Sequence, residues 1–120
     1  MKNILIVEDN VEMQKLYKNM FKNKQDEYGV EIEGDARKAF KRLAEKDFDL
    51  VLLDIIMEPM DGESFFACIR QDSKRKDIPV LVVSVLGQEG LDYMKKLTKV
   101  DFLQKPVTIE ELMEKIGSMI

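Results

Sequence analysis

The sequence 4-ILIVED-9 decides the fold, together with its counterpart 50-LVLLD-54. Each stretch is an apolar run of strand length that ends in acidic residues, Glu8 and Asp9 in the first and Asp54 in the second. A run that is apolar throughout indicates a strand buried on both faces, as in a parallel sheet covered by helices. Because the carboxyl ends of neighbouring parallel strands lie side by side, the sequence predicts that the three carboxylates converge at one edge of the sheet.

Two further runs deliver polar groups to the same edge. The apolar run 80-VLVV-83 ends in Ser84, and a further short run, 101-DFLQ-104, leads into Lys105 and Pro106. Open parallel sheets bind ligands in the crevice beyond the carboxyl ends of their strands. Acids, a hydroxyl and an ammonium group are therefore predicted to form one site.

Segments of helical period separate these runs, so strands and helices alternate along the chain. The alternation is typical of βα units on a parallel sheet, and five units fit this sequence. We therefore expect one domain over residues 1–120, a doubly wound α/β sandwich around a central five-stranded parallel sheet. The expected strands cover residues 3–8, 28–34, 49–54, 78–84 and 101–104.

Polar residues mark where the helices begin. Asn10, Asp35 and the pair Asp61-Gly62 precede helical segments, and Thr108 with Glu111 forms a capping box before the last one. The first helix is predicted to bury an apolar face, and a less regular fourth helix is expected after Gly87 and Gly90. The apolar face of the first helix comprises Met13, Leu16, Tyr17, Met20 and Phe21, and the fourth helix would carry Leu91, Met94 and Leu97.

Composition bounds the class of protein. The chain has 120 residues, of which 45% are hydrophobic and 35% charged, as in an ordinary soluble domain. The net charge of −4 argues against direct nucleic-acid binding. No apolar stretch approaches the roughly 20 residues of a membrane span, and the first residues lead into a strand rather than a signal peptide, so we expect a cytoplasmic protein. The lone Cys68 is predicted to be a buried, unreactive small hydrophobe.

The converging acids suggest a chemistry. Carboxylates held close together repel one another unless some are protonated or a cation lies among them. Mg²⁺ prefers oxygen ligands and typically takes one or two carboxylates together with phosphate oxygens. A phosphoryl group then becomes the natural ligand, and Asp54 is the candidate nucleophile for an aspartyl phosphate.

These motifs resemble the receiver domains of two-component response regulators, and the resemblance extends over essentially the whole chain. It depends on their order and spacing rather than on any single motif. The matching residues are Val7-Glu8-Asp9-Asn10, Asp54 followed by Met57 and Met60-Asp61-Gly62, Ser84, and Lys105-Pro106.

The resemblance implies a flavodoxin-like fold and a phosphorylation-dependent signalling switch, a phosphoacceptor that assists its own phosphorylation and dephosphorylation rather than an enzyme. Asp54 would accept phosphate from a histidine kinase or phosphotransfer protein, and a downstream effector, a missing output domain or a second copy in a homodimer would read the change. The implied Mg²⁺ ligands are Glu8, Asp9, Asp54 and the backbone carbonyl of Ile56. Lys105, next to a commonly cis Pro106 bond, would pair with the phosphate, and Ser84 and Phe102 would act as the switch.

Two features depart from the family pattern. Glu58 stands where the family usually has proline, and it either turns toward the ion or points to solvent. The segment between Ser84 and Lys105 is also about one residue short. Ile56 and Leu86 are apolar at positions that resemble those governing water access, so we expect slow self-dephosphorylation.

Three other classes share parts of this pattern. A pseudo-receiver would bind partners without phosphorylation, and Glu58 gives that alternative some weight. A flavodoxin-like cofactor binder would need a phosphate-cradling loop after the first strand, where Glu8 and Asp9 stand instead. A phosphatase with an aspartyl intermediate would need a second acid two residues past the nucleophile, where this chain has Ile56.

Overall fold

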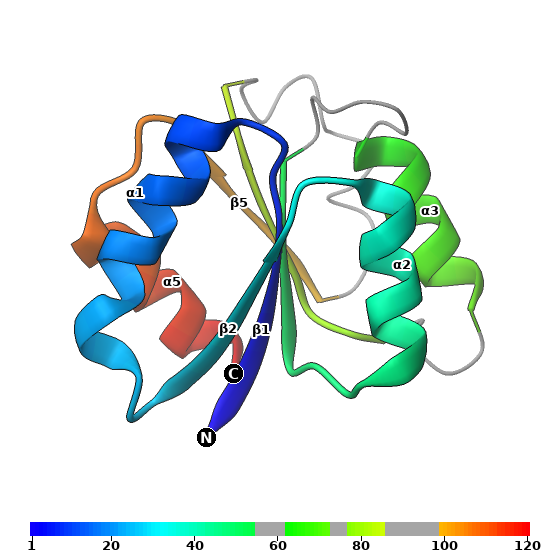
Figure 1. The fold of residues 1–120 in the computed structure, drawn as a ribbon, viewed down its shortest axis with the longest axis horizontal. Helices are drawn as coiled ribbons and strands as arrows, with labels where there is room; N and C mark the ends of the chain where they lie inside the picture. Colours follow the sequence, from blue (N-terminus) through cyan, green and yellow to red (C-terminus); the bar gives the residue numbers. More distant parts are fainter. Residues whose placement is uncertain (55–61, 73–76, 86–98) are drawn as a thin grey trace.

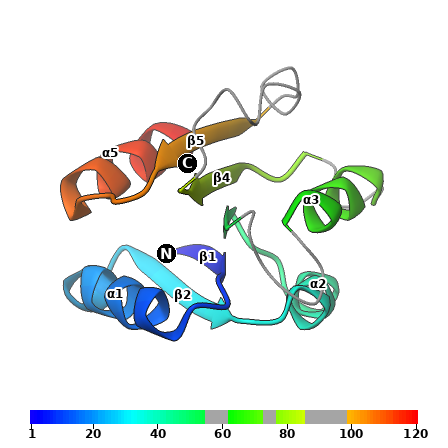
Figure 2. The same ribbon diagram turned by 90° about the horizontal axis from the view of Figure 1, so that it is seen from above.

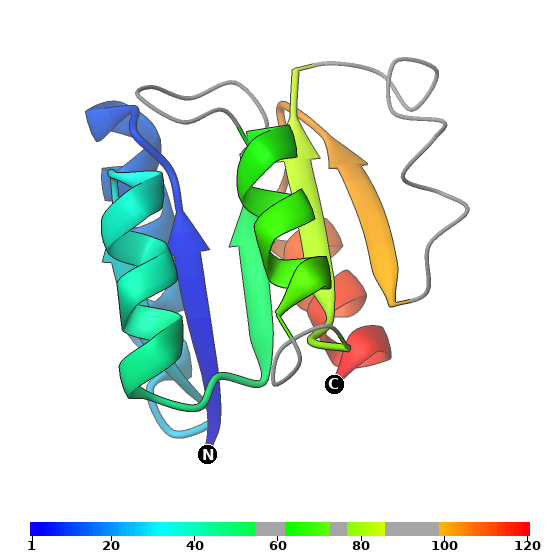
Figure 3. The same ribbon diagram turned by 90° about the vertical axis from the view of Figure 1, so that its right-hand side faces the viewer.

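The computed structural model describes residues 1–54, 62–72, 77–85 and 99–120. Its five strands form one sheet in the order β2-β1-β3-β4-β5, and all neighbouring pairs are parallel (Figure 3). The predicted sheet is therefore confirmed, and the largest shift in a boundary is at the start of β4, which begins at Val80 instead of Ile78. The strands are β1 (Lys2–Val7), β2 (Tyr28–Glu33), β3 (Leu50–Leu53), β4 (Val80–Ser84) and β5 (Val100–Gln104).

Helices cover both faces of the sheet, as a doubly wound fold requires. Helices α1 and α5 lie on one face and α2 and α3 on the other (Figures 1 and 2). Residues of β1 alternate between the layers: Ile4 and Ile6 pack with the first pair of helices, and Leu5 and Val7 with the second. The helices are α1 (Val11–Phe21), followed by the short 3₁₀ helix η1 (Lys22–Lys24), α2 (Ala36–Glu45), α3 (Gly62–Gln71) and α5 (Ile109–Met119).

Side-chain caps fix where three helices begin. The Asn10 side chain accepts a hydrogen bond from the backbone N–H of Met13, and Asp35 caps α2 in the same way. Thr108 accepts from the N–H of Glu111 at 3.1 Å, which confirms the capping box. These caps stabilise helix starts at the carboxyl edge of the sheet, where the polar residues gather.

The structure corrects two predictions about burial. Leu16, expected in the core, is 41% exposed, because it lies about 100° around α1 from the fully buried Tyr17. Cys68, expected to be buried, is exposed, because Phe65 and Ile69 define the buried side of α3. The expected fourth helix falls outside the described residues.

The helices found in the described ranges are too short or too polar to cross a membrane.

Candidate functional site

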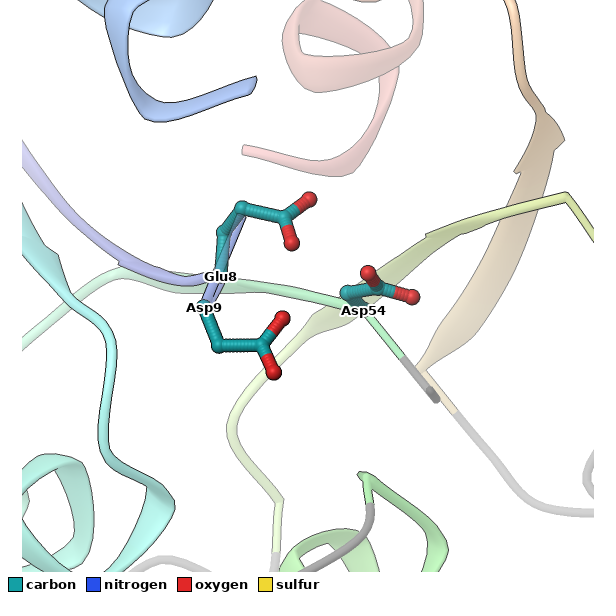
Figure 4. Close-up of side chains that lie close together, drawn as sticks. All are labelled: Glu8, Asp9 and Asp54. Atoms are coloured by element: carbon teal, nitrogen blue, oxygen red, sulfur yellow. The ribbon is translucent and has the colours of Figure 1, made fainter. Parts of the chain in front are cut away.

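The acidic residues meet where β1 and β3 end. Glu8 follows the last residue of β1, Asp54 follows the last residue of β3, and the two strands are neighbours in the sheet. The N–H of Asp54 still donates to the carbonyl of Val7, at 3.1 Å, so the sheet ladder itself holds the two strand ends together. One carboxylate oxygen from each of Glu8, Asp9 and Asp54 lies within 4.8 Å of the others (Figure 4).

The three acids differ in depth. Glu8 is fully buried, Asp54 is 7% exposed, and Asp9 is exposed. Figure 4 shows the Glu8 carboxylate directed to the side of the strands where α1 and α5 lie, and the Asp9 carboxylate directed to the opposite side. An ion approaching from solvent therefore meets Asp9 and Asp54 first, with Glu8 behind them.

Lys105 follows the last residue of β5, and its side chain contacts the acids. Its ammonium Nζ donates to Oε1 of Glu8 at 2.8 Å and to Oδ2 of Asp54 at 3.2 Å. Its backbone N–H donates to the carbonyl of Ser84 at 2.8 Å, and its bond to Pro106 is cis. The cluster thus holds three carboxylates and one ammonium group among the described residues.

The protonation of Glu8 reflects this crowding. Burial raises its pKa to about 7, the Lys105 ammonium opposes that rise, and the neighbouring Asp54 adds to it. Burial alone would lower the pKa of Lys105, but its hydrogen bond to Glu8 and the two carboxylate charges raise it instead. Lys105 is therefore held as a cation, and the cluster favours a further cation.

The other predicted site residues lie nearby or outside the described ranges. Ser84 is the last residue of β4 and is 1% exposed. Phe102 is 7% exposed, pairs with Val82 in the sheet and packs in the core on the α2 and α3 side, whereas the Glu8 carboxylate is directed to the other side. Ile56, Glu58 and Leu86, on which the expected metal ligand and phosphoryl lifetime depend, lie outside the described residues.

Sequence reasoning missed the contacts that α1 makes with the cluster. The N–H of Asn10 donates to Oε2 of Glu8 at 3.3 Å, and Nε2 of Gln14 donates to the Glu8 carbonyl at 2.6 Å. The available signal was the spacing of four residues from the Asn10 cap to Gln14, which places both on the same side of a helix.

A solvent-accessible pocket of about 330 Å³ opens beside the acids. A small anionic group can reach Asp54 through this pocket, and Lys105 places a positive charge on the pocket wall. The lining residues are Asp9, Asn10, Met13, Asp54, Val85 and Lys105.

The fold and this pocket define a class of protein. The family model of the response regulator receiver domain matches residues 4–117, and the chain belongs to that family. Its five-stranded sheet with interleaved helices is the flavodoxin-like fold of the chemotaxis protein CheY. The pocket of Glu8, Asp9 and Asp54 is consistent with Mg²⁺-dependent phosphorylation of an aspartate, and the chain is a phosphoacceptor rather than a classical enzyme.

Comparison with individual proteins shows how similar the chain is to other members of the family. The chain is 35% identical over 116 residues to the chemotaxis protein CheY of Listeria monocytogenes, covering 95% of this chain and 94% of that protein. It is 28% identical over 119 residues to the cyclic di-GMP phosphodiesterase response regulator RpfG of Xanthomonas campestris pv. campestris, covering 98% of this chain but only 32% of that protein. The solved response regulator TrrA from Thermotoga maritima, a complex with Mg²⁺ and BeF, is 25% identical with a TM-score of 0.84, and both chains are covered fully.

Receiver domains, as a family, pair with histidine kinases. The chain spans about a third of RpfG but nearly all of CheY, so its relatives include both short proteins and much longer ones.

Proposed function

We propose that Asp54 accepts a phosphoryl group from a phosphohistidine, carried by a histidine kinase or a phosphotransfer protein, and that the phosphorylated domain binds a downstream effector. One observation carries the proposal. The Asp54 carboxylate lies at the wall of an open pocket, 3.2 Å from the Lys105 ammonium and beside two further acids.

The transfer needs little from the protein beyond position and charge. An Asp54 carboxylate oxygen forms the bond to phosphorus, and the bond between phosphorus and the donor nitrogen breaks with its electron pair on that nitrogen. Lys105 already contacts Asp54, so its ammonium is placed to stabilise the oxygens of the incoming phosphoryl group.

The acids fit Mg²⁺. Three carboxylates supply hard oxygen ligands, and two of them face solvent enough to leave room for water and phosphate. Glu8, Asp9 and Asp54 would hold the ion, with the backbone carbonyl of Ile56 as a further ligand that the resemblance implies. When bound, the ion offsets the negative charge that builds up on the phosphoryl oxygens. The TrrA complex with Mg²⁺ and BeF supports this assignment.

Ser84 and Phe102 are proposed to carry the signal. Ser84 ends β4 next to the acceptor strand, so its hydroxyl can bond a phosphoryl oxygen. Phe102 pairs with Val82 in the sheet, two residues before Gln104, which pairs with Ser84. Its side chain already packs inward. A shift of Ser84 toward the phosphate would stabilise that inward packing and alter the surface beside it.

Exposed apolar side chains beside the pocket support docking of the phosphodonor there. Val85 lines the pocket and is 60% exposed, and Val11, next to the pocket residue Asn10, is also 60% exposed. Apolar groups around a charged pocket are typical of a protein interface, where they exclude water from the transfer.

The test is the intact mass of the protein after incubation with acetyl phosphate, with Mg²⁺ or with a chelator. We expect one phosphoryl group on the wild type with Mg²⁺ and none on Asp54→Asn. Asp35→Asn is the matched control, because Asp35 stands at the same edge of the sheet, caps α2, and asparagine caps equally well. It should be phosphorylated like the wild type. No phosphoryl group on the wild type would favour the pseudo-receiver alternative instead.

A further inference from the structure

Tyr17 carries a buried polar group that the proposed chemistry does not use. Its side chain has no exposed surface, and its hydroxyl has no hydrogen-bond partner within the described part of the chain. It packs in the core between the sheet and helices α1 and α5, among apolar residues such as Ile6 and Leu112. A hydroxyl buried without a partner costs about 1–3 kcal/mol, so its presence calls for a partner in another state of the protein.

The alternation of side chains along β1 and the lean of side chains on α1 place the Tyr17 hydroxyl on the same side of the sheet as Glu8. Ile4 and Ile6 face the α1 and α5 layer, and Glu8, two residues further on, continues that alternation. Figure 4 shows the Glu8 carboxylate on that side. The Tyr17 side chain leans toward the start of α1, as helical side chains do, and that start lies at the pocket through Asn10.

Electrostatics agree with this placement. Burial raises the pKa of Tyr17 above its ordinary value, and the Glu8 and Asp54 carboxylates raise it further. Tyr17 therefore keeps its proton and can donate it in a hydrogen bond.

Glu8 is the group that would need such a donor. It is fully buried, and its Oε1 holds the Lys105 ammonium at 2.8 Å. In the proposed function Lys105 turns to the phosphoryl oxygens on Asp54. That movement would weaken the charge compensation of a carboxylate that water cannot reach.

We propose that Tyr17 is a positioning residue whose hydroxyl donates a hydrogen bond to Glu8, directly or through one buried water, once Lys105 engages a phosphoryl group on Asp54. The inference rests on the proposed function, since it concerns the phosphorylated state of the same site. Tyr17 thereby holds Glu8 in place beside Asp9 and Asp54, the two carboxylates with which it would share the metal ion.

The test uses Tyr17→Phe, which removes only the hydroxyl. The control is Tyr28→Phe, because Tyr28 is half-buried at the opposite edge of the sheet, paired in register with Lys2. Calorimetry would measure the affinity for beryllofluoride with Mg²⁺, a mimic of the phosphoryl group, and thermal unfolding would measure ligand-free stability. We expect Tyr17→Phe to bind beryllofluoride about ten-fold more weakly, the effect of one hydrogen bond to a charged group, at equal or higher ligand-free stability. Tyr28→Phe should bind like the wild type.

A second measurement does not depend on that variant. The chain has three tyrosines and no tryptophan, so in a Tyr28→Phe, Tyr93→Phe background Tyr17 is the only tyrosine chromophore. Adding beryllofluoride and Mg²⁺ should shift its absorbance to longer wavelength as the hydroxyl gains an acceptor. An unshifted spectrum, or equal affinities of Tyr17→Phe and wild type, overturns this inference alone. A wild type that binds no beryllofluoride overturns the proposed function, and this inference with it.

Discussion

Two clusters of charged side chains lie at different depths of the molecule. On the surface beside β2, Arg42 bonds Glu31 at 2.7 Å and Glu33 at 3.0 Å, and Lys46 bonds Glu31 at 2.6 Å. At the strand ends, the single ammonium of Lys105 serves Glu8 and Asp54, with Asp9 beside them. Among the residues that the structure describes, the surface cluster balances two acids with two cations, whereas the buried cluster has three acids and one cation.

The two clusters shift the pKa of their carboxyl groups in opposite directions. Hydrogen bonds from Lys46 and Arg42 lower the pKa of Glu31, despite partial burial, and burial raises the pKa of Glu8 to about 7. A balanced cluster in contact with water stabilises the ordinary charged form. A buried cluster with excess negative charge is unfavourable by itself, which indicates a binding site for a cation or for chemistry.

The largest expected effect comes from removing the cation of the buried cluster. Lys105→Met leaves Glu8 and Asp54 without their ammonium, so we expect the free energy of unfolding at pH 8 to fall by about 3 kcal/mol. Urea unfolding in the presence of a chelator measures it. The control is Lys115→Met, because Lys115 is paired with Asp101 at 3.2 Å on the surface, and its loss should cost less than about 1 kcal/mol. Equal losses would remove the distinction between the clusters.

The next effect is a pH dependence that comes from Glu8. Its pKa rises from 4.5 in the unfolded chain to about 7 in the fold, so the folded state binds this proton more tightly. The resulting stability is present below about pH 4.5 and is lost as the pH rises through about 7, a change of about 2.5 kcal/mol between pH 5 and pH 8. Denaturant midpoints between pH 5 and 8, with a chelator present, measure it. Glu8→Gln should flatten the profile, and a wild-type profile that is already flat would contradict the raised pKa.

Removing one of the three acids should have a smaller effect, and it should raise the free energy of unfolding instead of lowering it. Asp54→Asn relieves repulsion with Glu8 and Asp9 while the amide oxygen still accepts from Lys105. We expect the metal-free protein to gain about 1 kcal/mol of stability, as is common when a functional site is disabled. Thermal unfolding with a chelator measures the gain, and added Mg²⁺ should narrow it by stabilising the wild type more. A destabilised variant would show that attraction to Lys105 outweighs the repulsion.

Most of the fold could be predicted from the sequence because strands buried on both faces leave an unmistakable pattern. The runs that end at Val7, Leu53 and Ser84 are buried throughout except near the chain start, and they set the sheet and its functional edge. The convergence of Glu8, Asp9 and Asp54 follows directly, because neighbouring parallel strands end together.

The features that the sequence did not predict depend on the angular position of residues around helices and on contacts between distant elements. Leu16 and Cys68 are apolar but lie at the margin of a helix face, and their residue type does not reveal which way the helix is turned. Tyr17 lies in the core as predicted, but the lack of a partner for its hydroxyl among the described residues depends on how α1 packs on β1. The meeting of Lys105 with the acids was predicted from the strand ends, but its particular bridge to Glu8, a residue 97 positions away, was not.

The smallest effect belongs to the surface cluster. Glu31→Gln removes the charge that Arg42 and Lys46 share, but Glu31 is 30% exposed and water screens its ion pairs, so we expect a loss of about 0.5 kcal/mol. Because the pKa of Glu31 is lowered in the fold, its contribution is present above about pH 4.5 and disappears as the pH falls further. High salt should remove it as well. Denaturant unfolding at low and high salt, with Glu114→Gln on α5 as the exposed control, measures it. A loss as large as that of Lys105→Met would mean that this balanced cluster holds β2 to α2, and that charge excess alone does not separate functional from structural clusters.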